Sequence, residues 1–182
     1  YLYIGIMSFC TSCSDFLDKV PDERTQIDSP DKVSALLVNA YPKVSYAAIV
    51  NTRCDYITDF GSVYSGAQPG ALFSFMGENF LWKDVIEDGN DSFENFWTGC
   101  YAAIAVSNQA LVSIDELGTP SSTINQKGEA LMTRAFSHFC LASLFAQQYD
   151  ESTASLYPGI PYVEKPETQP VEQLSLIHIS EP

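Results

Sequence analysis

A glycine-rich stretch of the sequence, residues 58–90, carries aromatic and polar side chains that are suited to holding a sugar. A flat aromatic ring packs on the apolar face of a sugar ring, and neighbouring polar groups hydrogen-bond to its hydroxyls. The polar candidates are Glu78, Asn79 and Asp84. From the aromatic residues we predict a set of glycan-binding residues, which comprises Tyr64, Phe75 and Trp82. For Trp82 the sequence pattern favours packing in the protein core, and the sugar contact is the alternative.

Acidic residues around the end of this stretch raise the question of catalysis. Hydrolysis of a glycosidic bond needs two positioned carboxyl groups, and the candidates are Asp84, Glu87, Asp88 and Asp91. These residues fall in a turn-rich acidic segment, where solvation accounts for them, and DGNDSFE lacks the ligand spacing of an EF-hand calcium loop. His138 lies in an apolar pattern without a second metal ligand. We therefore predict no catalytic residue, no metal site and no cofactor, with a surface glycoside hydrolase as an alternative.

The first eighteen residues, YLYIGIMSFCTSCSDFLD, contain a cysteine suited to lipid attachment. The apolar run over residues 1–9 is shorter than the roughly 20 residues that span a bilayer, and it matches the apolar core of a signal peptide. The small residues Thr11 and Ser12 precede Cys13. We predict that residues 1–12 are a lipoprotein signal peptide, truncated upstream, and that Cys13 is lipidated and anchors the protein to a membrane. A buried strand or helix over residues 1–9 is the alternative.

Composition predicts a folded, acidic protein. The chain has 9 lysine and arginine residues against 23 aspartate and glutamate residues, a net charge of −14, which disfavours nucleic acid as a partner. Hydrophobic residues make up 46% of the chain, enough for a packed core. Cys54, Cys100 and Cys140 match neither a zinc pattern nor an evident disulfide framework, so we interpret them as free thiols.

The first half of the chain is predicted to contain a tether, two helices and loops. Residues 13–28 are acidic and turn-rich, as in a tether. Ser29 and Pro30 suit a helix start, and Pro42 suits its end. A weaker helical pattern covers about residues 46–57, and long aromatic-rich loops follow over residues 58–90.

Two long helices dominate the second half. Asp91 and Glu94 have the spacing of a capping box, and Gly118 closes the apolar pattern that follows. Thr123 and Gln126 suit the start of a second helix that runs to about residue 148. This helix is apolar on most sides, so we expect it to lie centrally between other helices. From residue 150 the pattern indicates an extended surface segment, and residues 175–182 resemble a non-native translated tail.

These helices predict an all-α fold built from tetratricopeptide-like helical hairpins. The helical domain covers residues 29–174. We expect Trp97 in the core and Asn108 in a hydrogen bond between helices. Arg134 is expected to be a charge partner of Glu129 and Asp115.

Five segments occur in a characteristic order: CSDFLDKVP, SPDKVSALLVNAYP, FWTGCYAAIAVSNQAL, GEALMTRAFSHFCLASLF and GIPYV. Together they resemble the amino-terminal part of the SusD/RagB family, over residues 13–163. The residues that carry the resemblance are Trp97, Tyr101, Ile104 and Asn108, then Gly128, Glu129, Ala130, Arg134 and Ala135, then Gly159, Ile160 and Pro161. One difference is Cys10, at a position where lipoprotein signals usually carry leucine.

The resemblance implies a surface-exposed, lipid-anchored protein of the outer membrane in Bacteroidetes. It implies that the protein binds an oligosaccharide or another nutrient and that its partner is a TonB-dependent, SusC-like transporter. Family members are typically longer, so we expect an incomplete SusD-like domain here. A helical scaffold that binds protein or peptide is the alternative, because solenoid hairpins also serve that purpose.

Overall fold

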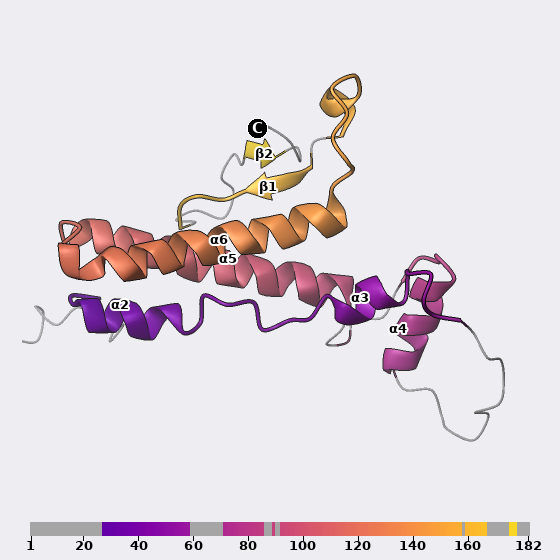
Figure 1. The fold of residues 1–182 in the computed structure, drawn as a ribbon, viewed down its shortest axis with the longest axis horizontal. Coiled ribbons are helices and arrows are strands. Elements are labelled where there is room, and N and C mark those ends of the chain that lie inside the picture. The colour runs from indigo at the N-terminus through magenta and orange to yellow at the C-terminus, as the bar shows by residue number, and fades with distance from the viewer. Residues whose placement is uncertain are drawn as a thin grey trace, which may run out of the picture.

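The computed structural model describes residues 27–58, 71–85, 89, 92–157, 159–166 and 175–177. Most of this part of the chain is helical, which confirms the all-α prediction (Figure 1). Cys13 and Tyr64, predicted as the lipidated and one of the ligand-binding residues, lie outside the described residues.

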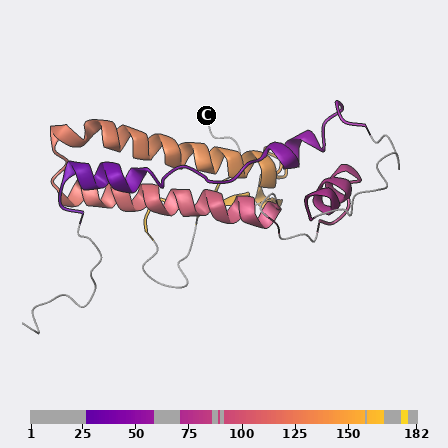
Figure 2. The ribbon, with the colours of Figure 1, turned by 90° about the horizontal axis from the view of Figure 1, so that it is seen from below.

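The fold is organised around a hairpin of two long antiparallel helices, α5 (Phe93–Glu116) and α6 (Ile124–Phe145). Helix α2 (Pro30–Leu37) packs against both of them (Figure 2). The predicted end of α5 is confirmed, because Gly118 has a φ of +78° and the Thr119 N–H donates to the Ile114 carbonyl at 2.9 Å. A glycine after the last turn accepts this left-handed conformation without a Cβ clash.

The starts of the three helices show which capping predictions hold. Ser29 caps α2 as predicted, since its hydroxyl accepts from the Lys32 N–H at 3.4 Å. For α5 the predicted cap was wrong by one residue, because Ser92 accepts from the Asn95 N–H at 3.1 Å. Thr123 is the N-cap residue of α6, as predicted, but its side chain makes no capping hydrogen bond. The Thr123 hydroxyl donates to the Pro120 carbonyl at 2.8 Å instead, within the short 3₁₀ turn η2 (Ser121–Thr123).

Two short helices lie between α2 and α5, and they correct the loop prediction. Helix α3 (Ala47–Asn51) is shorter than expected, and α4 (Ala71–Phe80) occupies part of the stretch predicted as long loops. Glycine content suggested a loop, but Gly77 lies inside α4. The buried Asn79 side chain donates to the Ile49 carbonyl at 2.8 Å and also contacts the Thr52 hydroxyl. This amide therefore ties α4 to α3.

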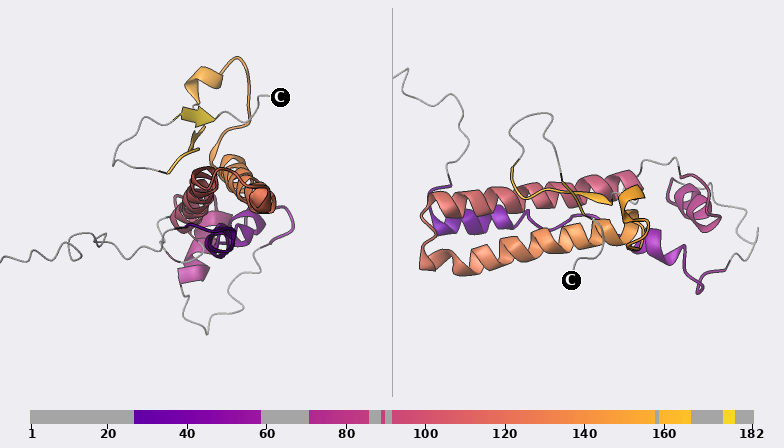
Figure 3. Two further views of the ribbon diagram at one scale, coloured as in Figure 1. Left: turned by 90° about the vertical axis from the view of Figure 1, so that its left-hand side faces the viewer. Right: turned by 90° about the horizontal axis from the view of Figure 1, so that it is seen from above.

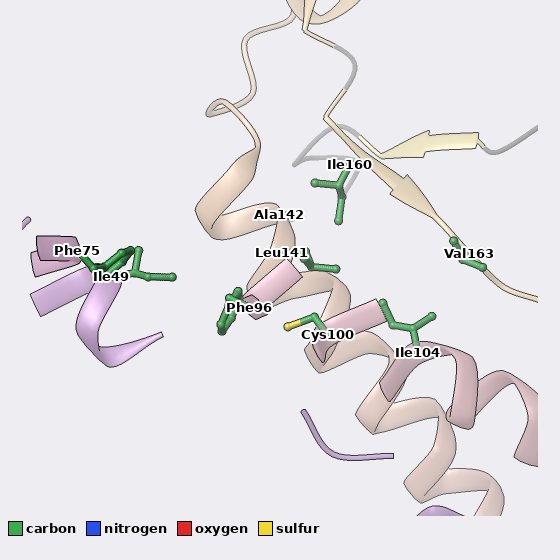
Figure 4. Packing of buried hydrophobic residues seen from close by; sticks show 9 residues of the cluster. All are labelled: Ile49, Phe75, Phe96, Cys100, Ile104, Leu141, Ala142, Ile160 and Val163. Atoms are coloured by element: carbon green, nitrogen blue, oxygen red, sulfur yellow. The ribbon is translucent and has the colours of Figure 1, made fainter. Parts of the chain in front are cut away.

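Within the described residues, the core consists of two clusters along the helical hairpin. One lies where α2 meets α5 and α6 and contains Val33, Leu37, Ala40, Ala110, Ile114 and Ala130. The other lies toward the opposite end, and Figure 4 shows its members: Ile49, Phe75, Phe96, Cys100, Ile104, Leu141, Ala142, Ile160 and Val163. Burial of these apolar side chains, at about 25 cal/mol per Å², is the main stabilising contribution.

The segment after α6 runs back along the hairpin, as the view from above in Figure 3 shows. After the 3₁₀ turn η3 (Ala154–Leu156) comes strand β1 (Ile160–Tyr162), which pairs antiparallel with β2 (Ser175–Ile177). We call residues 159–166 the strap. The strap was predicted to lie on the surface, but Ile160 and Val163 are buried in the core. The non-native origin predicted for residues 175–182 concerns the gene, and this pairing does not test it.

One face of α6 carries large apolar side chains that are exposed in the described structure. We call it the outer face of α6, and its large exposed side chains are Ile124, Leu131, Met132, Phe136 and Phe139. The expectation that α6 lies between helices on most sides is thus met only on the faces toward α2 and α5. Tetratricopeptide-like stacking stays a prediction.

Close packing in α5 gives a first prediction. A Cβ at residue 99 would lie 2.5 Å from Val44 Cγ1, whereas a Cβ at Gly128 in α6 would meet nothing within 4 Å. Valine is stiff and cannot move aside easily, so we expect Gly99→Ala to lower the free energy of unfolding by about 1–3 kcal/mol in urea titrations. Gly128→Ala is the control and should raise it by up to about 1 kcal/mol.

The double variant Gly99→Ala/Val44→Ala should recover part of the loss, because it removes the clashing methyl groups. Equal stability of Gly99→Ala and the wild-type protein would contradict this packing.

Candidate functional site

Trp82 stands at the end of α4 in a conformation that tryptophan rarely adopts. Its φ is +55°, and the Lys83 N–H donates to the Glu78 carbonyl at 2.9 Å, which places Trp82 where helices usually carry glycine. For a residue with a Cβ this left-handed conformation costs roughly 1–2 kcal/mol. A bulky residue held in a strained backbone points to a role other than stability.

The Trp82 side chain is 70% exposed. The guanidinium carbon of Arg53 lies 4.6 Å from the centre of the Trp82 ring and 5.3 Å from that of Phe93. A cation over an indole is stabilised by the ring electrons, so Arg53 steadies the ring against the end of the hairpin. An exposed and steadied aromatic plane is the kind of surface on which a sugar stacks.

The other residues predicted near Trp82 have different environments. Phe75 is only 2% exposed and packs on Phe93 with ring centres 5.7 Å apart, so in this structure it offers no face to a ligand. Asn79 is buried and bonded to α3. Of the acidic candidates, Asp84 is described and exposed, and the other three lie outside the described residues.

The strap is fixed to the hairpin by side chains that sequence reasoning assigned to other partners. Asn108 donates to the Val163 carbonyl at 3.0 Å and accepts from Arg134 at 3.0 Å. Arg134 also donates to the Glu164 carbonyl at 3.1 Å. The prediction that Asn108 bonds between helices is therefore confirmed, whereas the partners of Arg134 are Asn108 and the strap instead of Glu129 and Asp115. Those two carboxylates bond to Tyr41 and Lys127 respectively.

His138 and Tyr101 complete this attachment. The Val163 N–H donates to His138 Nε2 at 3.2 Å, so the opposite nitrogen, Nδ1, carries the proton and donates to the Arg134 carbonyl at 3.0 Å. Burial is the main cause that lowers the pKa of His138, and the neighbouring Arg134 charge acts in the same direction. The Tyr101 hydroxyl donates to the Pro161 carbonyl at 2.8 Å, and burial raises the pKa of Tyr101 to about 12.

A groove of about 540 Å³ lies between α5 and the strap. It is lined by Trp97, Tyr101, Ile104, Ala105, Gln109, Pro161, Val163, Lys165 and Pro166. The rings of Trp97 and Tyr101 lie 5.0 Å apart. Trp97 was predicted as a core residue, but it is partly buried: it packs edge-on against Phe145 and also faces the groove. The sequence pattern around Trp97 shows which face of α5 is apolar. It does not reveal the groove, because the opposite wall is formed by the strap, about sixty residues later in the chain.

The comparisons with known proteins fit this arrangement. A family model described as SusD-like, starch-binding and associating with the outer membrane matches residues 15–177. The chain belongs to the SusD-like family. The SusD-like match includes both long helices, the strap and Trp82. No curated protein and no solved structure matches the chain.

Among the described residues no helix is long and apolar enough to cross a membrane. In the same part of the chain, histidine, cysteine and acidic side chains form no group of three that could hold a metal ion.

The His138 geometry predicts a pH dependence of stability. Because the pKa of His138 is lowered in the folded state, the unfolded state binds the extra proton first as the pH falls. The stabilisation from neutral His138 is therefore complete above about pH 6.5 and is lost progressively below it. Urea titrations between pH 7.5 and 5.5 should show this decrease, and His138→Leu should flatten it.

His178→Gln is the control, since His178 is the second of two histidines in the sequence. The decrease should persist in that variant. An unchanged decrease in His138→Leu would contradict the assignment.

Proposed function

We propose that this SusD-like protein captures a glycan at the cell surface and passes it to a TonB-dependent, SusC-like transporter. Family membership supports glycan binding at the outer membrane. The observation that carries the proposal for this chain is Trp82, which combines an exposed ring with a strained backbone. The role is binding without catalysis.

Trp82 is the residue to which we assign the glycan contact. One side of the indole carries Arg53, and a side chain that is 70% exposed leaves room for a sugar on the other. The aromatic Tyr64, which falls between α3 and α4 in sequence, is proposed to extend this surface. Phe75 supports the site from below by packing on Phe93, which Arg53 also contacts.

Lipidation of Cys13 is proposed as the anchor that keeps the protein at the outer membrane. The sequence of residues 1–12 supports this assignment, with residues 13–28 as the tether to the helical domain over residues 29–174. A membrane-bound position with a tether of this kind suits a protein that hands its ligand to a channel in the same membrane.

A helical scaffold for protein binding is the second candidate function, and the outer face of α6 favours it. Met132 and Phe139 are 71% and 68% exposed, and they lie on one helix face with Leu131 and Phe136. Exposed apolar side chains grouped on one face are typical of contact surfaces for other helices. Glycan binding remains preferred, because the family match supports it directly.

The glycan contact assigned to Trp82 can be tested by a substitution that should lower ligand affinity without lowering the free energy of unfolding. We expect Trp82→Gly to lower the affinity for a maltooligosaccharide about two- to tenfold, because a lost stacking contact is worth about 0.5–1.5 kcal/mol. The free energy of unfolding should stay unchanged or rise by up to about 1 kcal/mol. Relief of the left-handed backbone, about 1–2 kcal/mol, exceeds the loss of the cation–π contact, about 0.5–1 kcal/mol.

Isothermal titration and urea unfolding of the full-length protein measure both quantities. Trp82→Phe is the matched control, since it keeps a ring on the same backbone and should retain most of the affinity. Full affinity in Trp82→Gly would refute a contact with this side chain.

Metabolic labelling and co-purification test the anchor and the partner. Cells that express the protein should incorporate labelled palmitate into it, and Cys13→Ala should abolish the label while Cys54→Ala preserves it. Affinity purification from outer membranes should recover a TonB-dependent transporter. Label that persists in Cys13→Ala excludes this anchor, and the absence of any transporter excludes the proposed transfer.

A further inference from the structure

The groove between α5 and the strap has a charge that differs from the rest of the molecule. The whole chain carries 23 acidic against 9 basic residues. Within the described part of the chain, however, the lining of the groove contains one cation, Lys165, and no carboxylate. The nearby Glu164 is not part of the lining.

Strand geometry explains why Lys165 lines the groove and the adjacent Glu164 does not. Side chains alternate in direction along an extended segment, so residues two apart share one side. Pro161, Val163 and Lys165 line the groove, whereas Tyr162, between the first two, packs on His138 with ring centres 4.7 Å apart. Hydrogen bonds from Asn108 to the carbonyls of Val163 and Lys165 hold this register.

The opposite wall of the groove is formed by α5, which contributes two aromatic rings and, further along the helix, a polar amide. Trp97 and Tyr101 present adjacent rings, and Gln109 lies twelve residues after Trp97 on α5, about 18 Å along the helix at 1.5 Å per residue. Along this wall an elongated ligand would meet two aromatic rings, small apolar side chains and an amide in succession. Across from it lies the ammonium-bearing Lys165, for which the described residues include no ion-pair partner.

We infer that the groove is a second glycan subsite, separate from Trp82, and that it takes an oligosaccharide that carries carboxylate groups. The inference rests on the proposed function, glycan binding, and names a substrate class for this part of the surface. Sugar rings stack on Trp97 and Tyr101, and a carboxylate pairs with Lys165. Lysine acts here as a point charge on a flexible stem, which suits carboxylates at varying positions along a chain.

Titration with two probes tests the inference in the full-length protein: an oligogalacturonide and a maltooligosaccharide of the same number of sugars. We expect Lys165→Gln to weaken oligogalacturonide binding about fivefold at low salt, and added salt to shrink the difference. Ala105→Trp, which fills the groove from an exposed position of α5, should weaken that binding tenfold or more. Neither variant should change the affinity for the maltooligosaccharide.

Two control variants distinguish effects at the groove from the general effect of losing a lysine or adding a tryptophan. Lys43→Gln removes a lysine that bonds to Asn39, and Ala102→Trp adds a ring at an exposed position of α5 that is not part of the groove lining. Both should bind the two probes as the wild-type protein does. Thermal unfolding of each variant verifies that it is folded.

The possible outcomes distinguish the two proposals. Oligogalacturonide binding that depends on Lys165 and Ala105 supports the subsite, even if Trp82→Gly leaves maltooligosaccharide binding intact. Maltooligosaccharide binding without oligogalacturonide binding overturns the subsite and keeps the proposed function. Equal oligogalacturonide affinity in the wild-type protein, Lys165→Gln and Ala105→Trp also overturns the subsite. Binding of neither probe overturns both.

Discussion

The hydrogen bonds between the strap and the helical hairpin are the constraint on which the rest of the structure depends. An extended segment placed over two helices has peptide groups that helices cannot pair, and each one buried without a partner costs about 1–3 kcal/mol. Here side chains supply the partners: Asn108 and Arg134 bond to strap carbonyls, and His138 accepts from the Val163 N–H. With these bonds in place, Ile160 and Val163 close the core, and Pro161, Val163 and Lys165 form a wall of the groove.

Trp82, unlike the residues that hold the strap, contributes little to the stability of the fold. Its backbone is strained and its side chain is exposed, so the fold gains little from it beyond the contact with Arg53. Features of this kind persist where a ligand uses them. Polar side chains within the hairpin thus fix the architecture, whereas the aromatic rings at its end and along its groove are the ones to which we assign binding.

The sequence predicts the helices well where the signals are local. Gly118 ends α5 and Ser29 begins α2 as expected. Prediction from the sequence fails where the burial of a side chain depends on distant residues or on the position at which a helix ends. Phe75 and Trp82 are seven residues apart, two helical turns, and would share a face of one continuous helix. Because α4 ends at Phe80, Phe75 is buried and Trp82 turns outward. The groove and the burial of the strap depend on contacts over more than fifty residues, which no local pattern contains.

The chain contains two tryptophans, Trp82 and Trp97, and each belongs to one of the two proposed binding surfaces. Their indole N–H resonances therefore report on the two surfaces separately. The most direct test of the account is a titration of the ¹⁵N-labelled full-length protein with a maltooligosaccharide, followed by nuclear magnetic resonance. The account predicts that the Trp82 indole signal shifts to saturation while the Trp97 signal stays in place. A Trp82 signal that does not move at saturating sugar would contradict it.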